Sequence, residues 1–346
     1  MTTPQRSPVP DLLRRVSFTV GALLFALTIM LLAFVEYAER NRASEGEIAP
    51  VFLALGGPAA QAAQEYSGMA WAGDQLVLLP QYPQRAVYAV PRAAILAALD
   101  SRSRETLPVA TIAFDDSAVR SQISGFEGYE AIAFAGDDVY LTIEARSSSG
   151  MRAYLLRGTL DEAGEQITLD ADSLVEIPLP VQIPNRGMEA LLVTEDAVYA
   201  FFESNGAAEN GAPRAERFTR DLQLLDPLPM PALEYRLTDA SAADTDGRFW
   251  VINYFFPGDA RVRPEDPLAE QYPPGSTHQS EPHVERLVQL QISATELEIV
   301  PSGILYLVLE SGVARNWEGL AQLDNRGLLL ITDRHPETLL AFIPFP

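Results

Sequence analysis

Acidic side chains stand at both ends of paired apolar runs, at spacings that could gather them in one place. In NWEGLAQLDNRGLLLITD, Glu318 stands before one apolar run and Asp333 closes the next. The same arrangement recurs twice more, with the pairs Glu130 and Glu144, and Glu189 and Glu203. Carboxylates gathered without histidine or cysteine suit a hard cation, so the pattern favours Ca²⁺ over Zn²⁺.

The elements that must position these acids are β-hairpins. Each pair brackets two apolar runs with a turn of Gly, Asp, Glu or Asn at the midpoint, and residues equidistant from such a turn face each other. Ser67 with Gln81, and Ser241 with Asn253, bracket two further hairpins of the same kind. The five hairpins span residues 67–81, 130–144, 189–203, 241–253 and 318–333. The bounding residues of each hairpin are therefore expected side by side at its open end.

The hairpins belong to a longer repeat. A third strand-like run follows each hairpin, as in RAVYAVP at 85–91 and VERLVQLQI at 284–292, and a fourth run usually comes next. Four-stranded units that recur about every 50–65 residues are typical of a β-propeller. Five units are favoured, with the run at 50–57 closing the ring. A sixth unit around 293–312 is the alternative.

In a propeller the first strand of every unit lines the central channel. Glu130, Glu189 and Glu318 would then converge at one mouth of the channel, where the ends of the second strands also lie. That many carboxylates near one axis repel one another unless some are protonated or a cation neutralises them. An alternative remains open, in which each glutamate accepts backbone N–H bonds from a neighbouring unit and locks the units together.

Composition narrows the function classes. The chain has 346 residues, a formal net charge of -22, three histidines and no cysteine or lysine. Without cysteine there are no disulfides, thiolate nucleophiles or cysteine metal sites. No basic patch is visible, so nucleic acid is not an expected partner.

The first 49 residues predict a membrane attachment. Residues 16–35 carry no charge and are long enough to span a bilayer core. Arginines before this segment favour a short cytoplasmic N-terminus at 1–15, with the body outside the cell membrane. Residues 36–49 read as a polar linker, and 50–346 as the propeller domain. A cleaved signal peptide and a buried core helix are the alternatives.

Three motifs in the body resemble one family. NRGMEALLV at 185–193 with AFFESNG at 200–206, NWEGLAQLDNRGLLLITD at 316–333 and YSGMAW at 66–71 resemble elements of the phytase-like propellers called "esterase-like activity of phytase". The resemblance covers about residues 50–346, and Glu189, Glu203, Glu318 and Asp333 match the family's acidic positions. The sequence departs from the family pattern at Gln81 and at Asn253-Tyr254.

The resemblance implies a metal-dependent hydrolase of phosphate or carboxylic esters. Under this hypothesis Glu130, Glu189, Glu318 and Asp333 hold Ca²⁺, and Glu203 is the general base. The rest of the predicted pocket consists of Glu144, Asn253, Ser67 and Ser241. The alternative is a non-catalytic propeller that binds a protein partner and uses a cation structurally. Fold alone does not decide between the two, because propellers host both kinds of function.

Overall fold

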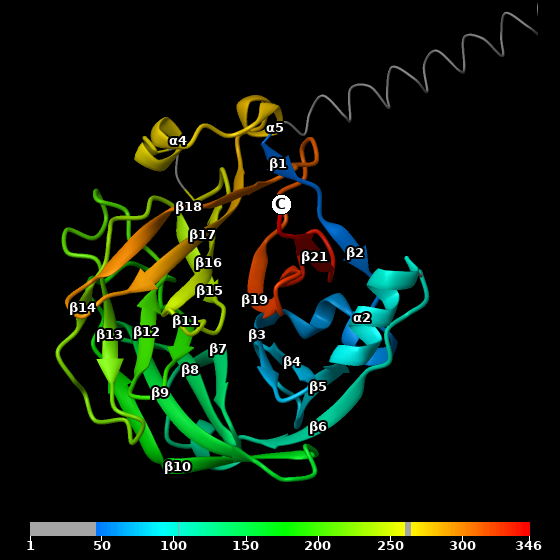
Figure 1. The fold of residues 1–346 in the computed structure, drawn as a ribbon. Helices are drawn as coiled ribbons and strands as arrows, with labels where there is room; N and C mark the ends of the chain where they lie inside the picture. Colours follow the sequence, from blue (N-terminus) through cyan, green and yellow to red (C-terminus); the bar gives the residue numbers. More distant parts are fainter. Residues whose placement is uncertain (1–45, 103, 260–263) are drawn as a thin grey trace, which may run out of the picture. The chain divides into compact units, whose positions relative to one another are not determined.

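The predicted hairpins form the inner halves of five four-stranded antiparallel units (Figure 1), except that the first strand of the fourth ends at Ala240, before the predicted start at Ser241. The structure is a computed structural model that describes residues 46–102, 104–259 and 264–346. Unit 1 consists of β3 (Tyr66–Ala72), β4 (Gln75–Pro80), β5 (Ala86–Pro91) and β6 (Ala110–Asp115). Unit 2 consists of β7 (Phe126–Ala135), β8 (Asp138–Ser147), β9 (Gly150–Leu160) and β10 (Gln166–Ile177).

The remaining units follow in chain order. Unit 3 consists of β11 (Met188–Val193), β12 (Val198–Phe202), β13 (Arg214–Phe218) and β14 (Leu228–Pro229). Unit 4 consists of β15 (Arg236–Ala240), β16 (Arg248–Phe255), β17 (Val284–Ile292) and β18 (Leu297–Leu307). Unit 5 consists of β19 (Trp317–Leu323), β20 (Gly327–Thr332), β21 (Leu340–Pro344) and β2 (Val51–Leu53).

The first strands of the units form a closed ring. β3 contacts β7, β7 contacts β11, β11 contacts β15, β15 contacts β19, and β19 returns to β3. Each pair of neighbouring units also shares a hydrophobic core of its own. Between units 4 and 5, for example, Trp250 and Ile252 pack with Leu328 and Leu330. The described residues therefore form an all-β fold with a propeller-like ring, as the repeat predicted.

The ring is closed by strands from distant parts of the chain. β2 pairs antiparallel with β21, with Leu53 opposite Leu340, so the closing role predicted for residues 50–57 is confirmed. β1 (Glu47–Ile48) adds to the outer edge of unit 4 by pairing in parallel with β18. The stretch considered for a sixth unit forms β18 itself, so that alternative is wrong.

Short helices occupy the connections. α2 (Arg92–Ser101) joins β5 to β6, and α3 (Ser117–Arg120) precedes unit 2. The Pro-rich excursion between β16 and β17 contains α4 (Pro267–Gln271) and α5 (Ser276–Ser280). Two 3₁₀ turns, η1 (Gly57–Ala60) and η2 (Ala62–Gln64), lead into β3.

The predicted membrane segment at 16–35 lies outside the described residues, as do the N-terminal stretch at 1–15 and most of the linker at 36–49. Within the described ranges, every helix is too short or too polar to cross a bilayer.

Candidate functional site: an acid-lined pocket at one mouth of the ring

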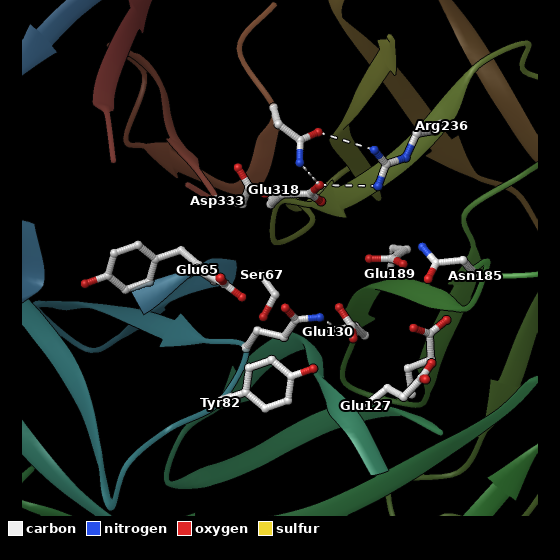
Figure 2. Close-up of a pocket in the computed structure, with 14 residues that line it drawn as sticks. Glu65, Ser67, Tyr82, Glu127, Glu130, Asn185, Glu189, Arg236, Glu318 and Asp333 are labelled. Carbon is white, nitrogen blue, oxygen red and sulfur yellow. Dashed lines mark hydrogen bonds and ion pairs between the residues drawn. The ribbon is translucent and has the colours of Figure 1, made fainter. Parts of the chain in front are cut away.

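A cavity of about 400 Å³ lies where the first strands of the units begin (Figure 2). Its wall is unusually acidic, and Arg236 is the one basic side chain among the described residues that line it. The carboxylic acids in the wall are Glu65, Glu127, Glu130, Glu144, Glu189, Glu318 and Asp333. We call this cavity the acid pocket. No described residue of the 256–283 excursion lines it, so that part of the excursion does not plug it.

A β-bulge recurs near the start of every first strand and explains how the acids reach the pocket. In unit 5, Trp317 pairs with Thr332 and Gly319 with Ile331, which leaves Glu318 as the extra residue. Bulges re-aim a side chain and are common beside functional sites. The extra residues in units 1, 2, 3 and 5 are Ser67, Glu130, Glu189 and Glu318, and all of them line the acid pocket.

The predicted register of unit 4 is wrong because the prediction centres its turn on Gly247. Ala240 pairs with Val251 and Ser241 N donates to Trp250 O, so the hairpin is centred between Thr245 and Asp246, and Thr238 takes the place expected for Ser241. Tyr254 corresponds to the ends of the second strands in the other units, namely Gln81, Glu144, Glu203 and Asp333.

Ser241 and Asn253 consequently lie away from the acid pocket. The Ser241 hydroxyl accepts a hydrogen bond from Trp250 N at 3.0 Å and closes the hairpin of unit 4. The Asn253 side chain donates to the backbone oxygen of Arg236 at 3.1 Å and accepts from Arg286 Nε at 2.8 Å. Both residues are buried, and neither lines the pocket.

The hydroxyl residues at the bulges link neighbouring units. Ser67 donates to the backbone oxygen of Tyr129 at 2.6 Å, and Thr238 donates to that of Trp317 at 2.6 Å. Each bond runs from the bulge of one unit to the residue before the bulge of the next. These hydroxyls join neighbouring units, but they donate to backbone oxygens, whereas the alternative expected glutamates that accept backbone N–H bonds.

The glutamates at the equivalent positions have fewer such contacts. Glu130 and Glu189 are both buried; Glu130 accepts from Gln81 Nε2 at 3.3 Å, and in the described part of the chain Glu189 has no hydrogen-bond or ion-pair partner. Burial raises the pKa of Glu130 well above its usual range, and the charge of Glu144 adds to the rise. Burial, followed by repulsion from Glu203 and Glu130, does the same to the pKa of Glu189. A buried carboxyl group without partners is either protonated or ionised with a bound cation that neutralises it.

Glu144 also has a raised pKa and a carboxylate oxygen without a hydrogen-bond partner among the described residues. Burial raises its pKa to about 7, with repulsion from Glu203 as the next cause. Its Oε1 atom is buried and has no hydrogen-bond partner among the described residues. The oxygen lies against Gly187, where an added Cβ atom would come within 2.7 Å of it. A larger residue at 187 would push the carboxylate away.

Glu318 shares a polar wall with Arg236. Its Oε1 atom accepts from Asn316 Nδ2 at 2.7 Å and faces Arg236 Nη2 at 3.3 Å (Figure 2). Burial raises the pKa of Glu318 to about 8 even though the Arg236 charge opposes the rise. The charge of Asp333 adds to the rise. Asp333 N donates to Asn316 O at 3.0 Å and both acids line the pocket, which confirms that Glu318 and Asp333 lie at one end of their hairpin.

Glu203, predicted as the general base, lies behind this wall. Its side chain is fully buried, is bound by Arg186 at 2.9 Å, and also pairs with Arg236. It does not line the acid pocket. The structure brings together Glu130, Glu144, Glu189, Glu318, Asp333 and Ser67, and it places Glu203 where two arginines hold it.

Asp239 is a buried acid that the sequence reading missed. It lies on β15 between Arg236, which lines the acid pocket, and Ala240, which lines a small apolar recess. Its carboxylate accepts backbone N–H bonds from Leu320 at 2.6 Å and from Ala240 at 2.8 Å. Burial nevertheless raises the pKa of Asp239 well above its usual range. The Leu-Thr-Asp sequence of 237–239 carried a signal, because it falls where the other units have their acid.

The wall suits a hard cation by its chemistry, since it offers carboxylate, amide and hydroxyl oxygens. In the described ranges, no three histidine or acidic side chains are arranged as a ready-made metal site. An ion would therefore have to draw the side chains inward. Glu189 and the Oε1 atom of Glu144 could move toward an ion without losing a hydrogen bond, because they have no hydrogen-bond partner among the described residues.

No family model matches the chain, and no curated protein matches it. Similar solved structures include the hydrazine synthase of Kuenenia stuttgartiensis, at 9% identity and a TM-score of 0.36 over 81% of this chain and 87% of that one. An exo-1,5-α-L-arabinanase from a bovine ruminal metagenomic library matches at 8% identity and 0.43 over 86% and 94%. A mutant α-L-arabinanase of Cellvibrio cellulosa matches at 13% identity and 0.42 over 86% and 92%. TM-scores below 0.5 at such identities assign neither a family nor an activity to this chain.

Proposed function

We propose that this chain is a cation-dependent hydrolase of phosphate or carboxylic esters, with Ca²⁺ as the favoured ion. The observation that carries the proposal is the set of buried glutamates that recurring bulges turn toward one cavity, where Glu189 has no partner among the described residues. Strongly shifted pKa values in a cleft are typical of functional sites. The resemblance to the phytase-like propellers favours the same class of reaction.

Each pocket residue has a proposed role. Glu130, Glu189, Glu318 and Asp333 would hold the ion, which supplies a Lewis acid that polarises the ester. Glu144 replaces Glu203 as the proposed general base, because a carboxyl with a pKa of about 7 accepts a proton efficiently at neutral pH. Glu203 would hold Arg186 and Arg236 in place from behind.

Calcium titration of the full chain by calorimetry is the direct test. Glu318→Gln is expected to lower calcium affinity at least tenfold, which corresponds to about 1.4 kcal/mol. The matched control is Glu298→Gln, because Glu298 is exposed on β18 and lies outside the pocket. Equal affinities in wild type and Glu318→Gln would remove Glu318 from the proposed ion site.

A second function is favoured by a specific observation. The hydroxyl contacts of Ser67 and Thr238 and the backbone contacts of Asp239 show that part of the ring's centre serves to join units. A non-catalytic propeller with a structural cation would use the acids in that way and bind a protein partner. Ester and phosphoester hydrolysis by Glu144→Gln separates the two, since loss of turnover with calcium binding intact supports catalysis.

The location of the site is a separate proposal. A single-pass anchor at 16–35 would hold the ring on the outer side of the cell membrane, where calcium is available. Protease treatment of intact cells tests the orientation: digestion of the ring without lysis supports it, and protection of the ring refutes it.

A further inference from the structure

A second cavity adjoins the acid pocket. Its volume is about 420 Å³, and it shares Arg236 and Asn316 with the acid pocket as a common wall. The rest of its lining is largely apolar and includes Phe256, Val313 and Pro336. Phe256 is 47% exposed, which is high for a large apolar side chain beside a polar site. We call this cavity the apolar cavity.

The common wall is held rigidly. Asn316 donates from Nδ2 to Glu318 at 2.7 Å and accepts at Oδ1 from Arg236 Nη1 at 3.3 Å. The Arg236 guanidinium also pairs with Glu203 and stacks 5.9 Å from the centre of the Tyr254 ring. Because Arg236 and Asn316 line both cavities, a ligand that contacts these two side chains can extend one part toward each cavity.

The charges of the acid pocket restrict what that ligand is. Seven carboxylic acids face one arginine in the pocket wall, and that arginine already has Glu203 and Glu318 as partners. Two of the other acids are paired with arginines of their own, Glu65 with Arg334 and Glu127 with Arg146. The four acids proposed to hold a divalent ion are ionised when they bind it, and their four negative charges exceed the ion's two positive charges, so a phosphate dianion would be repelled.

We infer that the substrate is an uncharged carboxylic ester whose apolar arm, a ring or branched chain, occupies the apolar cavity. This inference rests on the proposed hydrolase function and narrows it. The ester carbonyl would lie beside Arg236 and Asn316 and face the acids. Water adds to the carbonyl carbon, the bond from that carbon to the alkoxy oxygen breaks, and the alcohol leaves with a proton from the water.

The first experiment measures binding without catalysis. Methyl benzoate and methyl acetate are titrated by ligand-observed NMR into the full chain treated with a chelator. The expected result is at least tenfold tighter binding of methyl benzoate, because its ring fills the apolar cavity. Phe256→Ala should reduce that preference at least fivefold. The control Phe52→Ala should keep it, since Phe52 is also exposed, at 51%, but lies on β2 away from both cavities.

The second experiment measures turnover with calcium. Methyl benzoate is expected to be hydrolysed faster than phenyl phosphate, and faster hydrolysis of phenyl phosphate would overturn the charge argument. Equal binding of the two methyl esters, or a preference that survives Phe256→Ala, would overturn the apolar cavity as a subsite. If neither substrate is turned over while the Phe256-dependent preference is present, the proposed hydrolase function fails and the apolar cavity stands as a binding site.

Discussion

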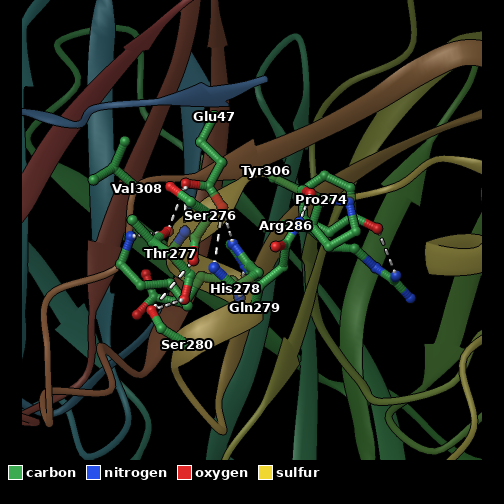
Figure 3. A network of polar contacts seen from close by, with 12 residues as sticks. Glu47, Pro274, Ser276, Thr277, His278, Gln279, Ser280, Arg286, Tyr306 and Val308 are labelled. Atoms are coloured by element: carbon green, nitrogen blue, oxygen red, sulfur yellow. Dashed lines mark hydrogen bonds and ion pairs between the residues drawn. The ribbon is translucent and has the colours of Figure 1, made fainter. Parts of the chain in front are cut away.

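The acid pocket and the junction between β1 and α5 both bury glutamates, but they treat the charge in opposite ways. Glu47 accepts hydrogen bonds from Thr277 Oγ1 at 2.6 Å and from His278 N at 3.1 Å, and faces His278 Nδ1 at 2.8 Å (Figure 3). The neighbouring Glu285, fully buried, accepts from Arg315 Nε at 2.8 Å and Trp317 Nε1 at 2.7 Å. We call these residues the paired cluster.

His278 connects the two glutamates of the paired cluster. Its Nε2 atom accepts from Glu285 N at 3.2 Å, so the proton of the neutral ring resides on Nδ1 and is donated to Glu47. Burial acts to raise the pKa of Glu47, but the hydrogen bonds from His278 and Thr277 outweigh it and the pKa is lowered. In the acid pocket, burial prevails and raises the pKa of Glu130, Glu189 and Glu318. Partners therefore distinguish a structural buried acid from one available to a ligand.

The most direct test of this comparison replaces one glutamate with alanine in the paired cluster and one in the acid pocket. Glu285→Ala should destabilise the protein by about 3–5 kcal/mol, because it leaves the buried Arg315 without its carboxylate. Glu189→Ala should cost far less in chelator, since in the described residues Glu189 has no such partner. Chemical denaturation of both variants is the measurement. Equal losses of unfolding free energy in the two variants would show that hydrogen-bond partners do not distinguish the two regions.

A smaller effect is expected at the edge of the ring. Glu47→Ala should cost about 2 kcal/mol, as expected for lost hydrogen bonds to a charged group. Its control is Glu298→Ala, an exposed acid on β18, which should stay within about 0.5 kcal/mol of wild type. If both variants unfold at the same denaturant concentration, β1 does not contribute to stability through Glu47.

Opposite pH responses sharpen the comparison further. Two glutamates of the acid pocket have folded pKa values above the unfolded 4.5, at about 7 for Glu144 and about 8 for Glu318. The folded state then holds more protons, so stability in chelator falls as pH rises from 4.5 to 8. Glu47 has a lowered pKa, so its contribution is present above 4.5 and is lost as pH falls through the lower folded value.

The measurement is thermal unfolding at pH 5 and pH 8. Wild type in chelator is expected to lose at least about 1.4 kcal/mol at pH 8, the value of one pKa unit. A double variant, Glu144→Gln with Glu318→Gln, should lose less. Calcium should stabilise wild type more at pH 8 than at pH 5, because the ion binds ionised carboxylates. A loss of equal size in wild type and the double variant would assign the pH response to other groups.

The smallest expected effect concerns the hydroxyl links. Thr238→Val should cost about 1 kcal/mol, because it removes one hydrogen bond to the next unit and keeps the side-chain volume. Thr295→Val is the control on an exposed turn. Calcium affinity should be unchanged in Thr238→Val, and a tenfold loss would move Thr238 from the joint between units into the ion site.

The fold was largely predictable because its signals are local. Apolar runs around Gly and Asp turns fixed the hairpins, and VERLVQLQI coincides with β17. The run at 50–57 could be placed because unit 5 lacked a fourth strand. The parallel pairing of β6 with β10, which joins units 1 and 2 into one eight-stranded sheet, left no comparable trace in the sequence.

The site was predictable in part. The repeated position of Glu130, Glu189 and Glu318 was visible, because a repeat places equivalent residues on one axis. The centre of the turn in unit 4 was not visible, since Asp244, Asp246 and Gly247 all favour a turn, and the wrong centre misplaced Ser241 and Asn253. The arginines that hold Glu203 also escaped notice, because ion pairs between distant segments depend on tertiary structure.

The closure of the ring by β2 and β21 has a consequence for how the chain is made. A ribosome releases Leu53 long before Leu340, yet each is the other's partner in unit 5. Until β21 emerges, β2 has no edge to join, and the core between units 1 and 5 stays open to water. Completion of the ring therefore waits until β21 has left the ribosome, and until then the apolar residues of that core stay uncovered in the nascent chain.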